Sequence, residues 1–152
     1  MPDFDIVVEA NMPSKSQIES IFRKATAEAQ NKVMEKVFEE SQLLVPVDTG
    51  VLKASGVLTK ATENSLEAYI DYGSEEINYA VKVHEDLTMQ HDPPTQAKFL
   101  EVPLTRHQAE IQRFAVEAME SEWRSAGFPA GGAKDAGFNI STSTKIETKS
   151  DF

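Results

Sequence analysis

Near the start of the chain, apolar residues recur every three or four positions over roughly seven helical turns. This spacing predicts an amphipathic α-helix. The helix should begin at the segment Ser16-Gln-Ile-Glu19, which has the Ser-x-x-Glu pattern of a capping box, and end near Leu44, before Pro46. A helix this long usually lies across a sheet or packs against a partner. Its apolar positions are Ile18, Phe22, Ala25, Ala29, Val33 and Val37, with Met34 and Phe38 widening the same face.

Alternating patterns elsewhere predict short strands. Residues 56–61 and 66–72 are separated by Thr-Glu-Asn-Ser, a good hairpin loop, so we expect an antiparallel pair. The second strand is apolar at even-numbered positions and mostly polar at odd-numbered ones, so one face should be buried. Residues 4–10 are also predicted to form a strand, because their centre is β-branched and the breaker Asn-Met-Pro follows.

Two short helices are predicted between the long helix and the end of the motif region. Asp48 is expected to cap the first by accepting hydrogen bonds from the backbone N–H groups of Gly50 or Val51. Gly56 is expected to stop that helix by taking a positive φ. Residues 79–85 fit either a strand or a helix, and the helix is favoured.

A second long helix is predicted to begin at Gln96 and to end at Gly127, with an early kink at Pro103. Between this helix and residue 85 lies a polar loop, residues 86–96. The apolar stripe of the helix consists of Leu104, Ile111, Phe114, Ala115, Ala118, Met119 and Trp123.

Residues 127–152 differ from the rest, because Pro, Gly, Ser and Thr dominate and no helical period continues. The partial alternation of Phe138, Ile140 and Ile146 fits either a strand-like arm that adds to a neighbouring subunit or a weakly ordered tail. We therefore predict an α+β protein with one domain, residues 1–126, and an extended C-terminal arm, residues 127–152. Its small antiparallel sheet should pack against the long N-terminal helix and a second long C-terminal helix.

The chain of 152 residues carries a formal net charge of −10 and has no cysteine. All of the excess charge lies in residues 1–126, which hold 12 basic and 22 acidic residues. Such a surface repels phosphate, which argues against a tight nucleic-acid binder. The absence of cysteine excludes disulfides and cysteine-based zinc sites, and no apolar run is long enough for a transmembrane helix.

Asp48-Thr49-Gly50 is the triplet that pepsin-like proteases use. In a retroviral-type enzyme, two such triplets meet across a dimer axis, and the two carboxylates share one proton. In those enzymes the triplet should follow an apolar strand, whereas here Pro46 and a long helix precede it. A helix cap explains the same residues without catalysis. A dimeric aspartic protease using Asp48 stays a weak alternative.

A second group of residues has the chemistry of metal ligands, since imidazoles and carboxylates can hold zinc or manganese. Its spacing matches no strong metal motif, and His84-Glu85 lacks a second histidine four residues later. We favour a polar turn, with a metal-dependent hydrolase using His84 and Glu85 as the alternative. The group consists of His84, Glu85, Asp86, His91 and Asp92.

Three segments together resemble a family of small tailed-phage proteins. Val45-Pro-Val-Asp-Thr-Gly-Val-Leu-Lys-Ala-Ser55 resembles the family's Pro-Val-Asp-Thr-Gly-x-Leu-x-x-Ser block. Tyr79-Ala-Val-Lys-Val-His-Glu85 resembles its Tyr-Ala-x-x-Val-His/Glu block. Ala97-Lys-Phe-Leu-Glu-Val-Pro-Leu104 resembles its third block. The family comprises minor capsid, tail-completion and head–tail joining proteins of lambda-like siphophages, and the blocks occur here in the family's order.

This chain departs from the family pattern between the second and third blocks. Many members have an aromatic residue followed by Gly-Thr there, whereas this chain has Asp86-Leu-Thr88 and a longer acidic loop. The motif residues that become candidates for interfaces are Pro46, Asp48, Thr49, Gly50, Ser55, Tyr79, Ala80, His84, Glu85, Lys98, Phe99 and Leu100.

The resemblance implies a structural protein of the virion neck, made in the host cytoplasm, with no enzymatic activity, cofactor or metal. Such proteins form rings, most often hexameric. Their partners are copies of themselves, a head connector or stopper protein on one side, and a tail terminator or tail tube protein on the other. Genome DNA passes through the channel without specific binding, and no membrane is involved. A tail terminator that caps the tube is the alternative within the virion.

Overall fold

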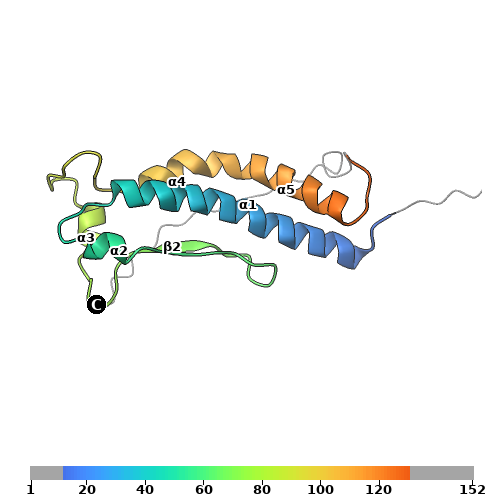
Figure 1. Cartoon of the computed structure of the whole chain (residues 1–152), viewed down its shortest axis with the longest axis horizontal. Helices are drawn as coiled ribbons and strands as arrows, with labels where there is room; N and C mark the ends of the chain where they lie inside the picture. The colour runs from blue at the N-terminus through green and yellow to red at the C-terminus, as the bar shows by residue number, and fades with distance from the viewer. Residues whose placement is uncertain (1–11, 131–152) are drawn as a thin grey trace, which may run out of the picture.

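The computed structural model describes residues 12–130. Its frame is an antiparallel pair of helical rods (Figure 1). The first rod is α1 (Lys15–Leu44), whose 30 residues extend about 45 Å. The second rod consists of α4 (Glu101–His107), the 3₁₀ helix η1 (Gln108–Glu110) and α5 (Ile111–Ser125).

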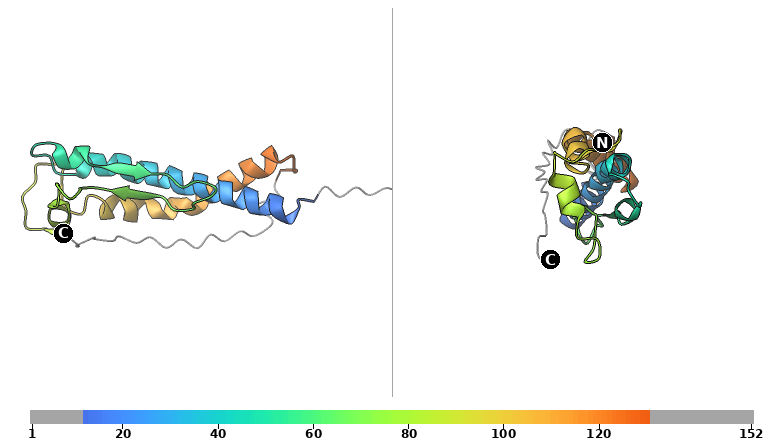
Figure 2. Two further views of the ribbon diagram at one scale, coloured as in Figure 1. Left: turned by 90° about the horizontal axis from the view of Figure 1, so that it is seen from below. Right: turned by 90° about the vertical axis from the view of Figure 1, so that its left-hand side faces the viewer.

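The remaining elements are short. A hairpin formed by β1 (Val57–Thr59) and β2 (Tyr69–Asp71) lies along α1 on the side opposite α4 and α5 (Figures 1 and 2). Two short helices, α2 (Val51–Ala54) and α3 (Ala80–Glu85), sit at the end of the molecule where α1 finishes. The predicted α+β class is therefore confirmed. Within residues 12–130, no helix is both long and apolar enough to cross a membrane.

Helix α1 begins two residues before the predicted start. Ser14 is the N-cap: its Oγ accepts from the Gln17 amide over 3.3 Å, and Gln17 Oε1 accepts from the Ser14 amide over 2.8 Å. Ser14-Lys-Ser-Gln17 satisfies the capping-box pattern as well as Ser16-Gln-Ile-Glu19 does. The prediction that placed the cap at Ser16 was wrong for that reason, whereas the end at Leu44 is confirmed.

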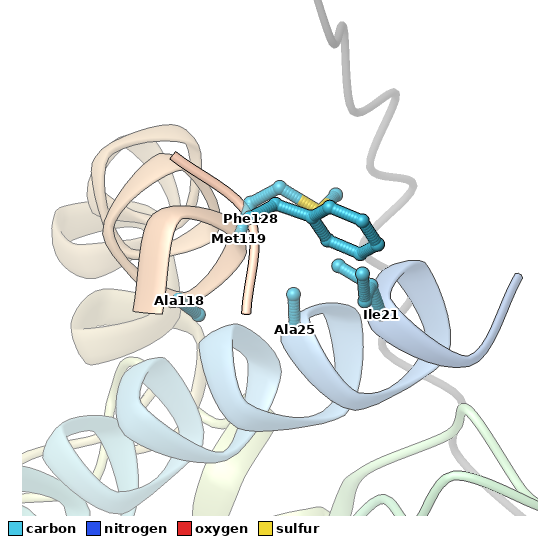
Figure 3. Packing of buried hydrophobic residues seen from close by; sticks show 5 residues of the cluster. All are labelled: Ile21, Ala25, Ala118, Met119 and Phe128. Carbon is cyan, nitrogen blue, oxygen red and sulfur yellow. The ribbon is translucent and has the colours of Figure 1, made fainter. Parts of the chain in front are cut away.

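One hydrophobic core joins the first half of α1 to α5 (Figure 3). Small alanines let the two helices approach closely, and larger side chains close the end of the core. Of the predicted stripe, Ile18 and Phe22 are 40% and 37% exposed, and Ile21 is buried in their place. The buried residues of this core are Ile21, Ala25, Ala118, Met119 and Phe128, with Trp123 packed against them.

The packed body continues past the end of α5. Gly127 ends the helix as predicted, with φ of +89°, and Phe128 folds back into the core. The indole Nε1 of Trp123 donates to the Pro129 carbonyl over 2.9 Å and holds this turn. Phe128 and Pro129 therefore belong structurally with the helices, although they fall on the arm side of the boundary expected from composition.

The second rod differs from the single helix predicted from Gln96. It begins at Glu101, because Lys98 has a left-handed backbone with φ of +58°, which a right-handed helix does not accept. Pro103 lies in the first turn, where its missing N–H leaves no hydrogen bond unmade. The irregularity falls instead at η1, so the kink expected at Pro103 was misplaced.

Ion pairs join α1 to η1 and to the end of α4. The two ring nitrogens of His107 lie 2.8 Å from Glu110 Oε1 and 2.8 Å from Glu40 Oε2. Lys36 Nζ lies 2.5 Å from Glu110 Oε2, and Arg106 pairs with Glu40. The Lys36 ammonium, followed by His107, lowers the pKa of Glu110 to about 2. These charges fasten the middle of the second rod to α1.

The predicted hairpin is confirmed, with a shorter ladder than expected. Its strands are antiparallel, and Leu58 pairs with Ile70. These two residues are half-buried, while Tyr69 and Asp71 are exposed, so the predicted alternation holds. The predicted strand at residues 4–10 and the arm segment 131–152 lie outside the described residues.

Candidate functional site

Three segments that lie far apart in the sequence pack around one cluster where α1 ends (Figure 1). Each of the three motif segments contributes at least one buried side chain. The motifs found in the sequence are therefore parts of a single structural unit. Its buried residues are Val45, Leu52, Ala80, Val83 and Phe99, with Leu44, Tyr72, Ile77 and Leu100 packed against them.

Two backbone hydrogen bonds hold the third segment and the residue before it against the second segment and the end of α1. The Gln96 amide donates to the Leu44 carbonyl over 2.8 Å, and the Lys98 amide donates to the His84 carbonyl over 2.7 Å. Between them Phe99 is only 1% exposed. Its ring lies edge-on to Tyr72, with centroids 5.2 Å apart, and to His84 at 4.9 Å. Such edge-to-face contacts stabilise aromatic groups beyond their burial.

The first segment turns into α2 differently from the prediction. Gly50 is the residue before the helix, with φ of +84°, and no side chain caps the helix. Asp48 is exposed and does not cap α2, because Gly50 takes the left-handed conformation at the cap position itself. The cap predicted for Asp48 was therefore wrong.

Ser55 fastens α2 to the end of the hairpin. Its Oγ donates to the Leu52 carbonyl over 2.6 Å and accepts from the Gly73 amide over 2.8 Å. Gly73 has φ of +92°, and a Cβ there would lie 2.8 Å from the Ile77 carbonyl oxygen. The serine of the motif thus has a structural role.

Gly56 is required for close packing rather than for a positive φ. A Cβ at this position would lie 2.4 Å from Gln42 Nε2 and 2.7 Å from Tyr72 Cε1. The Tyr72 hydroxyl lies 2.7 Å from Ser41 Oγ and accepts from Gln42 Nε2 over 2.7 Å. Burial raises the pKa of Tyr72. The prediction that Gly56 takes a positive φ was wrong.

The second and third segments are joined by charge. His84 is 5% exposed, and its Nδ1 lies 2.7 Å from Glu85 Oε1. Lys98 Nζ contacts Glu85 Oε2 and lies 3.0 Å from Glu101 Oε2. Lys98 and then His84 lower the pKa of Glu85, while Glu85 and then Glu101 raise the pKa of Lys98. Among the described residues, the buried Nε2 of His84 has no hydrogen-bond partner.

The proposed catalytic and metal-binding groups do not converge. Asp48 and Thr49 are exposed in the connection before α2. Glu85, which the metal interpretation needs as a ligand, is paired with Lys98. Within residues 12–130, no three His, Cys, Asp or Glu side chains are grouped as metal ligands would be. The ligand set built on His84 and Glu85 is therefore not assembled in the described part of the chain.

The candidate residues divide into a buried, a half-buried and an exposed set. Ala80, His84 and Phe99 are buried in the cluster, and Pro46, Gly50, Ser55, Lys98 and Leu100 are half-buried. The exposed set consists of Asp48, Thr49, Tyr79 and Glu85.

Sequence reasoning did not identify a group of exposed apolar side chains at this end of the molecule. Within residues 12–130, twelve large apolar side chains are exposed, and seven of them lie at this end. Only the tertiary packing shows which apolar residues of the motif segments face solvent. A concentration of this kind is typical of interaction surfaces. The seven are Leu43, Val47, Val51, Tyr79, Val81, Leu87 and Met89.

Comparison with known proteins identified no relative of this chain. No protein-family model matches the chain, and neither a curated protein nor a solved structure matches it significantly. The family resemblance therefore rests on the three segments themselves.

Proposed function

We propose that this chain is a structural subunit of the neck of a tailed phage, acting in tail completion or head–tail joining. One observation carries the proposal. The three segments that resemble blocks of that family pack together as one unit through Leu52, Val83 and Phe99. Segments that serve one function are expected to lie close together in the fold. Segments that resemble the family blocks only by chance would not be expected to pack against one another.

The surface around this unit supports an interaction role. Val47, Val51 and Val81 are exposed in segments that also contribute to the buried cluster, and Leu87 is exposed in the loop of residues 86–96. Exposed apolar side chains cost free energy in an isolated subunit, and contact with a partner recovers it. In the proposed role, this end contacts a neighbouring copy in the ring or the adjacent ring of connector, terminator or tube protein.

The acidic balance fits the same role. The chain carries a net charge of −10, and such a surface repels the phosphates of a passing genome. This repulsion would let DNA slide through the ring rather than stick to its wall. We propose that part of the acidic surface lines the channel. A basic channel wall in the assembled ring would contradict this part of the proposal.

The test is a stop codon at Gln17 in a phage that encodes this chain, with the lysate viewed by electron microscopy. Filled heads and normal-length tails lying apart are the expected result, restored to joined particles by a plasmid copy of the gene. Tails of irregular length would identify a terminator instead. Joined, normal-looking particles without the plasmid copy would overturn the proposal.

Two full-length variants supplied from the plasmid test the enzymatic alternatives in the same assay. Asp48→Asn removes the carboxylate that an aspartic protease needs, and Glu85→Gln removes the carboxylate that the metal-dependent hydrolase needs. A structural role predicts that Asp48→Asn restores joined particles. Loss of joining with Asp48→Asn, in a protein that folds normally, would show that the Asp48 carboxylate is needed, as a catalytic group or as an interface contact.

A further inference from the structure

The second rod narrows to 3₁₀ geometry at η1, between α4 and α5 (Figure 1). A 3₁₀ turn inside a longer helix often marks a hinge. The hydrophobic clusters lie on either side of this turn along the rod: Phe99 and Leu100 precede α4, and Ala118 and Met119 follow in α5. No residue of η1 is buried. Between the two clusters, η1 is held against α1 by charged side chains.

His107 connects η1 to α1 through both nitrogens of its ring. Nδ1 lies 2.8 Å from Oε1 of Glu110 in η1, and Nε2 lies 2.8 Å from Oε2 of Glu40 in α1. The side chains of His107 and Glu40 are each 17% exposed, so water competes little with their contact. The ring therefore bridges the two elements.

Both partners of the ring act as hydrogen-bond acceptors. The Lys36 ammonium, followed by His107, lowers the pKa of Glu110 to about 2, so this carboxyl group is ionised at neutral pH. Glu40 is paired with Arg106, which stays charged. An ionised carboxylate only accepts, so each ring nitrogen has to donate. A histidine ring donates from both nitrogens only when it carries two protons and a positive charge.

The other charges around the ring come from each element packed against it, and they hold the two carboxylates in place. In both carboxylates one oxygen contacts the ring and the other oxygen contacts a cation. The cations that contact these second oxygens are Arg106 of α4 on Glu40 Oε1, and Lys36 of α1 and Arg113 of α5 on Glu110 Oε2, at 2.5 Å and 3.1 Å. The oxygens that face the ring are therefore positioned independently of it.

A neutral ring cannot bridge the two carboxylates. It has one N–H, so its other nitrogen would present a lone pair to a carboxylate oxygen, and that contact would open. We propose that His107 is a pH-dependent latch, which holds η1 on α1 while its ring is doubly protonated and releases the bridge when the ring is neutral. The stabilisation by this bridge is present while the ring is charged and is lost as pH rises.

Hydrogen exchange of the full-length protein at about pH 5.5 and about pH 8.5 tests the latch. Rates are expressed as protection factors, which removes the pH dependence of the chemical exchange step. The amides of residues 107–112 should lose protection by about tenfold between the lower and the higher pH, because one charge-assisted hydrogen bond is lost.

Three full-length variants identify the group responsible. His107→Gln has one donor end and one acceptor end at every pH, so its protection should be low at both pH values. Glu40→Gln supplies an amide that can donate to the bare Nε2 of a neutral ring, so the loss of protection at high pH should disappear. His91→Gln is the matched control, since it removes a histidine outside this network, and it should follow the unchanged protein.

Equal protection of the unchanged protein at both pH values would overturn the proposal. A fall in protection that persists in His107→Gln or in Glu40→Gln would also overturn it. Circular dichroism at both pH values checks that each variant is folded. The inference goes beyond the proposed function and does not depend on it, because these measurements use the purified protein alone and the neck assay uses the phage.

Discussion

The hydroxyl oxygens of Tyr72 and Ser41 lie 2.7 Å apart in the packed region between β2 and α1. Ser41 is buried, and its Oγ donates to the Phe38 carbonyl over 2.8 Å. Because the Ser41 hydroxyl proton is used in this bond, Ser41 Oγ must accept from the Tyr72 hydroxyl. The Tyr72 hydroxyl in turn accepts from Gln42 Nε2. This arrangement needs Tyr72 in its neutral form and places the hairpin on the second half of α1.

Replacing Tyr72 with Phe should lower the free energy of unfolding by about 1–2 kcal/mol, because Ser41 Oγ and Gln42 Nε2 lose a partner inside the packed region. Urea denaturation followed by circular dichroism measures the change. Tyr69→Phe is the matched control, since Tyr69 is half exposed. Equal stability of the two variants would show that the hydroxyl network contributes nothing.

Alkaline pH should weaken the same contact. Burial raises the pKa of Tyr72 above its ordinary value of 10.0. Above pH 10 the unfolded chain therefore loses the Tyr72 proton while the folded chain keeps it, and stability falls as pH rises. Denaturation between pH 9 and 11 should show a shallower fall for Tyr72→Phe than for the unchanged protein. Parallel curves would mean that this tyrosine ionises equally in both states.

The large-scale fold was predictable from the sequence because periodicity over many residues is a strong signal. The thirty residues of α1 and the alternation of the hairpin both follow from it. Single-residue backbone features were harder to predict. Ser14 and Ser16 offer equal capping patterns, Gly50 replaces Asp48 at the start of α2, and Lys98 takes a left-handed conformation that nothing in its sequence marks.

The candidate site was predicted only in part. The motif segments were found, but sequence alone did not show that Phe99 would lie between Tyr72 and His84. Nor could it show that Val47 and Val51 face solvent, because burial depends on contacts made across long stretches of chain. Local patterns identify elements, and tertiary packing decides which face of each is covered.

Acid should loosen the contact between α1 and η1. The Lys36 ammonium lowers the pKa of Glu110 from 4.5 to about 2. A carboxyl group whose pKa is lowered on folding stabilises the protein above its unfolded value, and that stability is lost as pH falls from about 4.5 toward 2. Denaturation across this range should be less pH-dependent in Glu110→Gln. Glu117→Gln, at an exposed position of α5, is the control and should follow the unchanged protein.

The motif residues should separate into stabilising and surface positions. Phe99→Ala should cost about 3–5 kcal/mol, because it leaves a cavity among Tyr72, His84 and the rest of the cluster. Asp48→Asn and Thr49→Ala should change stability by less than about 0.5 kcal/mol, since both side chains are exposed. Thermal unfolding checks all three. A large loss from either exposed position would mean that its side chain makes contacts in the folded state.

Two truncations should behave differently, because the packed body ends after Phe128 rather than before it. A chain that stops after Ala130 keeps Phe128 in its core and the hydrogen bond from Trp123 to Pro129, so its melting temperature should match that of the full chain. A chain that stops after Gly127 loses both contacts and should be less stable by about 3–5 kcal/mol. If the C-terminal arm predicted from the sequence holds neighbouring copies together, the chain that stops after Ala130 should fold, yet it should form a smaller assembly than the full-length protein in sedimentation experiments. A truncation after Ala130 that sediments as the full-length protein does would show that assembly does not depend on residues 131–152.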